Sequence, residues 1–484
     1  MTLKSMIQMT VALTAAVFPL SAKAQSTGEA AAAAVKQKID AMFPLKGDLA
    51  TLFTAKSAGD GVDLIFDTER LLDLFKGMGL TTEGAVPLAT HLTPQPDGTF
   101  KLAQQANIAI KAKITTAAGQ MNVDVRAGSI KGSGVSDPDL RYMKSMETEI
   151  TGLDLAFSTP SSASHRTVDR WIMSQSTSNV ADGKFDLVSK AVEVGRRETG
   201  SLNDMSMDRN ESTTTIKAMP YRALQDLLTA WLVQAQDGKA PATIADSLRQ
   251  DIRQLMPFGT EISMQGRLDQ TRIAQGATKF GLEKIDYDVM WKDLTGLSSI
   301  NFKMNIEGVD TGGQLPPSYA KLVPDTIALD MTVTGIDVQT PWRYYFETVD
   351  FANPAALNEN QTGLITSYLL PDDKIPVSVN KMTLTGDLYQ AQLSGTATYR
   401  TKGSAATAEM RLTTPSLDPL IAHLQDRAKS DPQLGQAAFF ALMAKGFAAK
   451  GTDGSMYWDL AMTENGQFLV NGHDFTPPRQ PSAP

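Results

Sequence analysis

Residues 285–306 read IDYDVMWKDLTGLSSINFKMNI and contain two runs in which apolar and polar residues alternate. The apolar members are Ile285, Tyr287, Val289 and Trp291 in the first run and Ile300, Phe302, Met304 and Ile306 in the second. Alternation with a period of two is typical of β-strands that turn one face inward and the other to water. The segment therefore predicts an antiparallel hairpin with one apolar face.

The same alternation recurs elsewhere in the chain. It runs through residues 108–114 and 121–125, which flank a turn at residues 118–120, and through residues 327–333. Strands that follow one another through short polar turns pair as antiparallel meanders rather than as a parallel sheet. The sequence thus predicts a β-dominated α+β protein with long, curved antiparallel sheets.

Three segments instead have apolar residues at helical spacing. Residues 29–42 are rich in alanine and predict a short N-terminal helix. Residues 221–255 are interrupted at residues 238–241, and residues 415–449 are interrupted at Asp431-Pro432. Each of these two longer segments predicts a helix pair.

Two similar motifs indicate an internal duplication. TGLD at residues 151–154 and TGID at residues 334–337 each precede a Thr-Pro pair. We interpret them as marking two β-rich units in tandem. The predicted organisation is a lead-in over residues 25–60, a first unit over 61–257, a second unit over 258–475 with a helix pair at 415–449, and a disordered proline-rich tail over 476–484.

The first 24 residues have the pattern of a cleavable signal peptide. Lys4 is followed by a mostly apolar run from Met6 to Leu20, and Ala22-Lys23-Ala24 has the small residues that a signal peptidase requires. Cleavage after Ala24 would leave no transmembrane anchor, because a spanning helix needs about 20 apolar residues. We expect a periplasmic protein, with secretion as the alternative.

The composition excludes several classes of function. The chain has no cysteine, so it has no disulfides, thiolate metal sites or cysteine nucleophile. Its formal net charge is -8, and loss of Lys4 and Lys23 with the signal changes it to -10. A negative charge of this size disfavours nucleic acid as a partner. No cofactor-binding motif, including the glycine-rich phosphate loops, is present.

The C-terminal region resembles a family of uncharacterised exported proteins of Gram-negative bacteria, catalogued only as a domain of unknown function. The resemblance is carried by the helix end at residues 444–446, the turn at 453–454, the strand at 457–460 and the closing segment at 465–472. The hairpin at residues 381–399 is also similar. The resemblance implies a periplasmic, sheet-rich protein and transfers no catalytic residue.

Ser318 and Lys321 form a Ser-x-x-Lys pattern, in which one helical turn places a lysine beside a nucleophilic serine in penicillin-recognising enzymes. Such enzymes also need a Lys-Thr-Gly or Lys-Ser-Gly strand, which the chain lacks. Pro316, Pro317 and Pro324 limit the helix to about two turns. We therefore predict no catalytic site and treat Ser318 and Lys321 as the weak alternative.

The histidines and close carboxylates predict no metal site. No two of the four histidines have the spacing of a ligand pair. Asp286 and Asp288 share one face of a predicted strand, which also carries Lys292. We interpret that face as a solvated outer surface.

The predicted helices are too short to cover the predicted sheets. A twelve-residue strand is about 40 Å long, whereas a sixteen-residue helix is about 24 Å long. The apolar faces must either pack on another sheet or form a groove for a lipid-like ligand. The ligand-facing candidates are the eight apolar residues of the 285–306 hairpin.

Three functions follow from these observations. The first is a non-catalytic periplasmic protein that binds an apolar or amphipathic envelope component or acts in envelope maintenance. The alternatives are an exported serine hydrolase acting on cell-wall or lipid material, and a scaffold in a periplasmic complex.

Overall fold

The computed structural model describes residues 28–476. The segments 74–75, 77–78, 117–118, 138–139, 141, 201–203, 238, 352–357 and 401–405 within that range are excepted. The predicted signal peptide at residues 1–24 lies outside the described residues, as do residues 477–484 of the predicted disordered tail.

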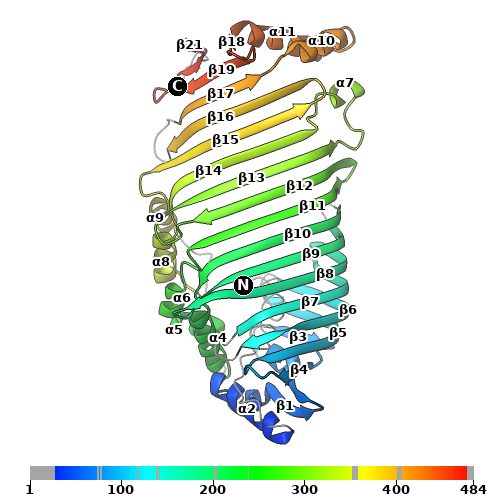
Figure 1. Ribbon diagram of the computed structural model, residues 1–484, viewed down its shortest axis with the longest axis vertical. Helices are drawn as coiled ribbons and strands as arrows, with labels where there is room; N and C mark the ends of the chain where they lie inside the picture. The colour runs from blue at the N-terminus through cyan, green and yellow to red at the C-terminus, as the bar shows by residue number, and fades with distance from the viewer. Residues whose placement is uncertain are drawn as a thin grey trace. The chain divides into compact units, whose positions relative to one another are not determined.

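The chain divides into two compact units. Unit 1 comprises Met1–Ile262 and Arg343–Leu357, and unit 2 comprises Ser263–Trp342 and Asn358–Pro484. Strands predominate in both units, and in each they form a long antiparallel open sheet (Figure 1). The predicted β-dominated, antiparallel α+β architecture is therefore confirmed.

The sheet of unit 1 runs from a group of short strands to six long ones. Its strands are β1 (Phe53–Ala58), β2 (Gly61–Phe66), β3 (Leu80–Glu83), β4 (Leu88–Pro94), β5 (Phe100–Thr116), β6 (Gly119–Asp137), β7 (Tyr142–Thr159), β8 (Ser162–Ala181), β9 (Lys184–Gly200) and β10 (Asp204–Met219). The strand β2 pairs with β1 and β4, β5 pairs with both β3 and β4, and each strand from β5 to β10 pairs with the next.

The sheet of unit 2 consists of antiparallel strands, some joined by tight turns and others by segments that contain helices. Its strands are β11 (Glu261–Gln275), β12 (Thr278–Lys292), β13 (Leu297–Asp310), β14 (Thr326–Asp337), β15 (Lys374–Gly386), β16 (Tyr389–Arg400), β17 (Thr407–Thr414), β18 (Ala449–Lys450), β19 (Met456–Met462), β20 (Phe468–Val470) and β21 (His473–Asp474). The strands from β12 to β17 pair in sequence order, β17 pairs with β19, and β19 pairs with β18 and β20.

The predicted hairpins are present. Ile285 lies opposite Ile306 and Trp291 lies opposite Ile300 across β12 and β13, so the two apolar runs share one face. In unit 1, β5 turns into β6 at Gly119, whose φ of 122° lies in the region that favours glycine.

The helices agree only in part with the predicted helix pairs. The described residues contain α2 (Glu29–Met42), α3 (Thr68–Asp73), α4 (Tyr221–Ala235), α5 (Pro241–Ser247), α6 (Arg249–Gln254), α7 (Pro317–Ala320), α8 (Gln339–Thr348), α9 (Glu359–Leu369), α10 (Asp418–Arg427) and α11 (Pro432–Phe447). The predicted N-terminal helix is confirmed as α2. The segment expected as the second helix of the first pair is broken at Leu248, and α8 and α9 were not predicted.

The internal duplication is not confirmed. Gly152 and Gly335 both have positive φ, 60° and 79°, so the two motifs share a local irregularity. The Thr-Pro pair after the first motif lies at the turn between β7 and β8, whereas the second pair begins α8. The two motifs thus lead into different elements.

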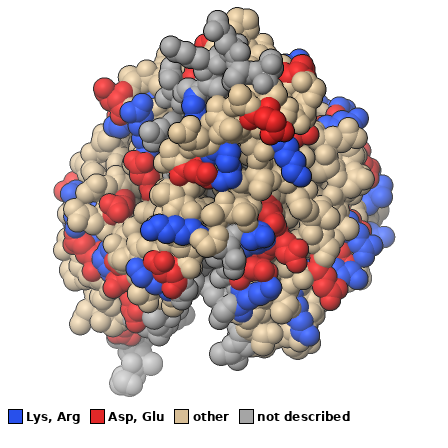
Figure 2. All heavy atoms as spheres, turned by 90° about the horizontal axis from the view of Figure 1, so that it is seen from below, with Lys and Arg blue, Asp and Glu red and all other residues tan. Residues whose placement is uncertain are grey.

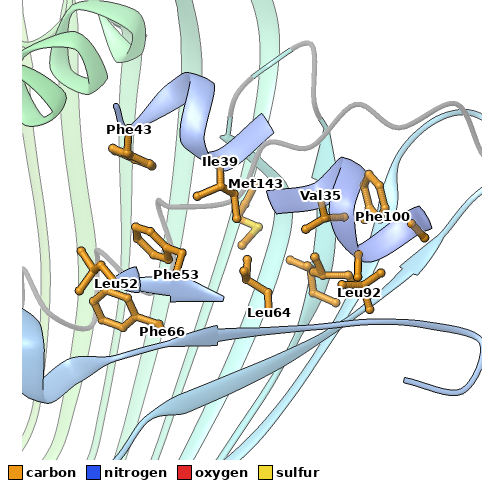
Figure 3. Close-up of a cluster of buried hydrophobic side chains, with 14 of the residues drawn as sticks. Val35, Ile39, Phe43, Leu52, Phe53, Leu64, Phe66, Leu92, Phe100 and Met143 are labelled. Carbon is orange, nitrogen blue, oxygen red and sulfur yellow. The ribbon is translucent and has the colours of Figure 1, made fainter. Parts of the chain in front are cut away.

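One end of the unit 1 sheet is closed by α2, which lies against its apolar face (Figure 3). Val35, Ile39 and Phe43 follow one another at intervals of four, which places them on one side of the helix. They pack with residues of β1, β2, β4, β5 and β7, including Leu64 and Met143. This cluster is the main core of unit 1.

A line of irregular positions crosses the long strands of unit 1. It consists of Asn107, Gly128, Gly152, Asp169, Gly195 and Asp208, all of which interrupt the regular pairing of their neighbours. A bulge shifts the alternation of a strand by one residue. Two residues of the same strand that lie on opposite sides of this line therefore point to the same face when their numbers differ by an odd number.

Candidate functional site

The apolar face of unit 2 consists of rows of side chains that lie opposite one another across neighbouring strands. The rows are Ile285, Ile306, Ile327, Leu384 and Ala391; Tyr287, Met304, Leu329, Met382, Leu393, Leu412 and Trp458; Val289, Phe302, Met331, Val379, Gly395, Met410, Leu460 and Val470; and Trp291, Ile300, Val333, Val377, Ala397, Ala408, Met462 and Phe468. All eight predicted ligand-facing residues belong to these rows. We call this surface the unit 2 apolar face.

The unit 2 apolar face is only half-buried. Apart from the buried Trp458 and the exposed Met462, each of its residues has intermediate exposure. Burial nevertheless raises the pKa of Tyr287, as expected for a phenol in an apolar environment. Half-burial of so many large apolar side chains leaves much of their surface available for contact.

The other face of the same strands is polar. Lys284 pairs with Asp286 at 2.7 Å, and Lys303 pairs with Asp330 at 3.6 Å. Gln265 donates a hydrogen bond to Asp288 at 3.1 Å. The two faces of this sheet therefore differ sharply in chemistry, as the alternating sequence predicts.

Helix α11 lies at one end of the unit 2 apolar face. The indole of Trp458 donates a hydrogen bond of 2.8 Å to the Ala444 carbonyl of α11. The helices α10 and α11 pack against each other and against α7 around Leu424, Leu434 and Ala438. Figure 1 shows α10 and α11 beside β17 and β19, so these two helices adjoin the last strands of the face.

Unit 1 also has an apolar sheet face on the long strands. Ala127, Ile150, Leu153 and Val168 are buried there, and half-buried residues including Ile108, Leu155 and Trp171 pack against them. We call this surface the unit 1 apolar face. Across β5 to β7 its residues lie opposite one another, as Ile108 does with Ala127 and Ala127 with Leu153.

A hollow of about 880 Å³ lies at one end of the long strands of unit 1. Its lining includes one residue row across six strands, formed by Thr82, Ala112, Val123, Phe157, Ser164 and Gly200. Val123 and Phe157 are on the side of the unit 1 apolar face, two residues from Val125 and Leu155 of the next row. The volume is within the range of small-molecule pockets.

A smaller hollow of about 340 Å³ lies further along the same strands. Gly134, Met146 and Gln175 lie opposite one another in its lining. Its remaining lining residues are largely polar and include Ser133, Ser145 and Lys190. The unit 1 apolar face is thus hollowed at two places.

Four charged residues form a connected network beside the unit 1 apolar face. Arg166 contacts Glu198 at 2.9 Å, Arg196 contacts Glu198 at 2.8 Å, and Arg196 also contacts Glu193 at 3.4 Å. Asn210 donates to the same Glu193 oxygen at 3.3 Å. Two arginines and two glutamates give this network no net charge. We call these five residues the polar network.

Two residues of the polar network and a nearby tryptophan have buried polar atoms without a protein partner. Within the described part of the chain, Trp171 Nε1, Arg196 Nε and Asn210 Oδ1 make no hydrogen bond. Trp171 lies directly opposite Glu193, and Glu193 lies directly opposite Asn210. Buried polar atoms of folded proteins are normally satisfied, so a group of three calls for a physical reason.

The polar network favours the charged form of Glu198. Burial raises the pKa of Glu198, but the hydrogen bond from Arg196 and the charges of Arg166 and Arg196 outweigh it, so that the pKa is lowered overall. The side chains of Arg196 and Glu193 are 18% and 15% exposed. The arginines therefore stabilise the Glu198 carboxylate in a place that is largely shielded from water.

The structure does not join Ser318 and Lys321 into a catalytic pair. Ser318 lies in the four-residue helix α7, and its carbonyl accepts a hydrogen bond from His423 at 3.0 Å. Lys321 is exposed at the end of that helix. The described residues include no hydrogen bond between the two side chains.

Two further histidines have carboxylate partners. His91 contacts Asp63 and Asp60, and His165 contacts Asp154 at 2.8 Å. Ser164 and His165 are consecutive in β8, so their side chains point to opposite faces. Among the described residues, no group of three or more potential metal-binding side chains is arranged to hold an ion.

Comparisons of the chain with protein-family models, with curated proteins and with solved structures find no match. Within the described residues, the helices are all too short or too polar to cross a bilayer. In Figure 2, basic and acidic side chains are interspersed over the face shown, without a continuous basic area.

The sequence analysis did not find the polar network. Glu193 and Arg196 of β9 are three residues apart and still contact each other, because the line of irregular positions passes between them at Gly195 and shifts the alternation. A signal is nevertheless present in the sequence: Gly152 and Gly195 stand inside strands of otherwise regular pattern, and an isolated glycine in a strand indicates a bulge.

Proposed function

We propose that this chain is a non-catalytic, exported periplasmic protein that holds the apolar part of an amphipathic envelope component against its apolar sheet faces. The observation that carries the proposal is the half-buried state of the unit 2 apolar face. The signal-peptide pattern and the C-terminal resemblance support the location. The proposal includes the curvature predicted for the sheets, because only a curved sheet can form a groove around a ligand.

The physical argument concerns the free energy of apolar surface in water. Each Å² of apolar surface removed from water is worth about 25 cal/mol. An acyl chain lying over Tyr287, Met304 and Leu329 would remove surface from both partners. The alternating polar face gives no comparable gain, so the ligand is expected on one face only.

Site-specific photocrosslinking and a matched pair of variants test this proposal. A photoreactive phenylalanine analogue at Leu329 should crosslink to extracted envelope lipid, whereas the same analogue at Asp330 should not. Ala397→Trp places a large side chain on the unit 2 apolar face and should reduce the binding of a fluorescent fatty acid. Thr396→Trp, one residue away on the opposite face, is the matched control.

The proposal fails if the wild-type protein carries no lipid in native mass spectrometry and binds no fluorescent fatty acid. It also fails if Ala397→Trp and Thr396→Trp have equal effects while both variants unfold at the wild-type temperature. Equal crosslinking from Leu329 and Asp330 would likewise contradict it.

One surface favours the scaffold alternative. In α11, Phe439 and Phe440 are each 57% exposed, and Leu442, Met443 and Phe447 are also exposed. A surface helix normally has charged residues on its outer side, and a patch of this kind is typical of a protein interface. A photoreactive residue at position 440 that crosslinks to an envelope protein, with crosslinking reduced by Phe439→Ser, would support it.

The hydrolase alternative depends on Ser318 and Lys321, and no contact between their side chains supports it. Labelling of Ser318 by a fluorophosphonate or a β-lactam probe would restore this alternative. Ser318→Ala is the negative control, and absence of labelling in the wild-type protein would exclude the hydrolase alternative.

A further inference from the structure

The outer side of α11 carries a group of exposed apolar side chains. Its five members on the helix are Phe439, Phe440, Leu442, Met443 and Phe447. At 100° per residue they cover about 160° of the helix surface, on the side opposite the buried Leu434 and Ala438. The exposed ring of Phe475 extends the group, because its centroid is 5.0 Å from that of Phe447. We call these six residues the α11 patch.

Helix α11 offers almost no side chain that can form a hydrogen bond with a partner. From Ala437 to Phe447, Lys445 is the only residue with a polar side chain, and its ammonium group already pairs with Asp418. Protein interfaces normally contain about one hydrogen bond per 100–200 Å² and have a polar rim. The hydrocarbon of a bilayer neither donates nor accepts hydrogen bonds. The composition of α11 therefore fits lipid better than the partner protein of the scaffold alternative.

The charge of this region is also compatible with a membrane surface. Residues 418–450, which include α10, α11 and β18, contain four basic and three acidic residues, so their net charge is +1, whereas that of the whole chain is -8. Lys429 precedes α11 and Lys450 follows it, and both are exposed. Basic residues that flank an apolar helix favour contact with anionic lipid headgroups.

The α11 patch adjoins the unit 2 apolar face through two hydrogen bonds. Trp458, which belongs to that face, donates to the Ala444 carbonyl of α11 at 2.8 Å. The backbone N–H of Phe475, which belongs to the patch, donates to the carbonyl of Phe468 on the face at 2.8 Å. The patch therefore lies beside the surface on which the proposed function places the ligand.

We propose that the α11 patch docks on the surface of a lipid bilayer and holds the Trp458 end of the unit 2 apolar face beside it. The partner is the bilayer itself, whose acyl chains surround the exposed rings of Phe439 and Phe440. The inference rests on the proposed function in one respect, since it makes the bilayer the place where the amphiphile enters or leaves the apolar face.

Flotation of the mature protein with vesicles tests the docking. The wild-type protein should float with phosphatidylcholine vesicles, and more completely when these also contain phosphatidylglycerol. Leu442→Ser and Leu364→Ser are a matched pair, because these leucines are 45% and 42% exposed on α11 and α9 of the same unit. Leu442→Ser should weaken binding about threefold or more, and Leu364→Ser should leave it unchanged.

A double variant enlarges the effect. Phe439→Ser combined with Phe440→Ser should weaken vesicle binding about tenfold or more, because both rings are 57% exposed. All variants should unfold at the wild-type temperature, since the replaced side chains are exposed. Equal flotation of the wild-type protein and the double variant would refute the docking.

The absence of cysteine from the chain allows insertion to be measured directly. Met443→Cys and Leu364→Cys each create a single attachment site for a fluorescent label, and the two wild-type side chains are both 42% exposed. Nitroxide groups on the acyl chains of the vesicle lipid should quench the label at position 443 but not the label at position 364. Equal quenching at both positions, or quenching at neither, would refute insertion of α11.

The outcomes distinguish the docking from the proposed function. If the protein binds a fluorescent fatty acid without vesicles but floats with neither kind of vesicle, the proposed function stands and the docking is refuted. If it floats but binds no fatty acid, the docking stands and the proposed function fails. In the absence of flotation, crosslinking to an envelope protein, or dimerisation that the double variant abolishes, would assign α11 to a protein partner and refute the docking.

Discussion

Asp169 and Gly195 lie opposite each other at the line of irregular positions in unit 1, and they leave no room for a side chain on Gly195. A Cβ atom built there would be 2.0 Å from Asp169 Oδ2. Gly195 also has a φ of 66°, which L-residues with a Cβ rarely adopt. Both the backbone and the neighbouring side chain therefore require glycine.

Gly195→Ala should destabilise the protein by about 2 kcal/mol or more, because the left-handed backbone alone costs about 1–2 kcal/mol and the contact with Asp169 adds to it. Chemical denaturation measures the change. Gly276→Ala is the control, since Gly276 has a φ of 58° but no atom near its Cβ position. This variant should lose only the stability that the left-handed backbone costs. Equal losses in the two variants would show that the contact with Asp169 has no cost.

Ser298→Ala should destabilise the protein by about 1–3 kcal/mol, because the buried Ser298 hydroxyl connects two groups. It accepts a hydrogen bond from Trp291 Nε1 at 3.0 Å and donates one to the Ile336 carbonyl at 2.7 Å. Thermal and denaturant unfolding should both detect the loss. Ser299→Ala, on the other face of β13, should change stability by less than about 0.5 kcal/mol. A neutral Ser298→Ala would refute the bridging role.

The sequence predicts those parts of the fold that depend on regular spacing. The shared face of Ile285 and Ile306 and the bounds of α2 follow from periodicity, whereas the register that places these two residues opposite each other does not. The capping box formed by Asn358 and Gln361 at the start of α9 is a further helix signal in the sequence. The helix α8, which follows the strand β14 directly, also has a start signal, because Asp337 accepts hydrogen bonds from the backbone N–H groups of Gln339 and Thr340.

The polar network could not be predicted, because it depends on irregular pairing. In an unbroken strand, Glu193 and Arg196 are three residues apart and would lie on opposite faces. The positive φ of Gly195 between them brings both to the same face. The alternating pattern predicts the residues of the unit 2 apolar face. Their half-buried state depends on how much of the face the helices cover, and the spacing of apolar residues in the sequence does not specify that.

Leu64→Ala should destabilise unit 1 by about 2–5 kcal/mol, since Leu64 is fully buried in the core between α2 and the sheet. The packed helix prevents the site from collapsing around the missing atoms. Gln37→Ala, on the exposed side of α2, is the control and should be close to neutral or slightly stabilising. Denaturant unfolding distinguishes them, and a neutral Leu64→Ala would show that α2 does not stabilise the sheet.

His91 should make stability depend on pH in the neutral range. The hydrogen bond to Asp63 raises its pKa above 6.5 against the opposing effect of burial, and Asp60 raises it further. Because the folded-state pKa is the higher one, the contribution is complete below about pH 6.5 and is lost as the pH rises through the folded-state value. The partners are partly exposed, so the contribution should be below about 1 kcal/mol. The loss of unfolding free energy caused by His91→Gln should therefore be larger at pH 5.5 than at pH 8.5. In a protein that carries Asp63→Asn, this dependence on pH should be weaker. A loss that is the same at both pH values would contradict the assignment.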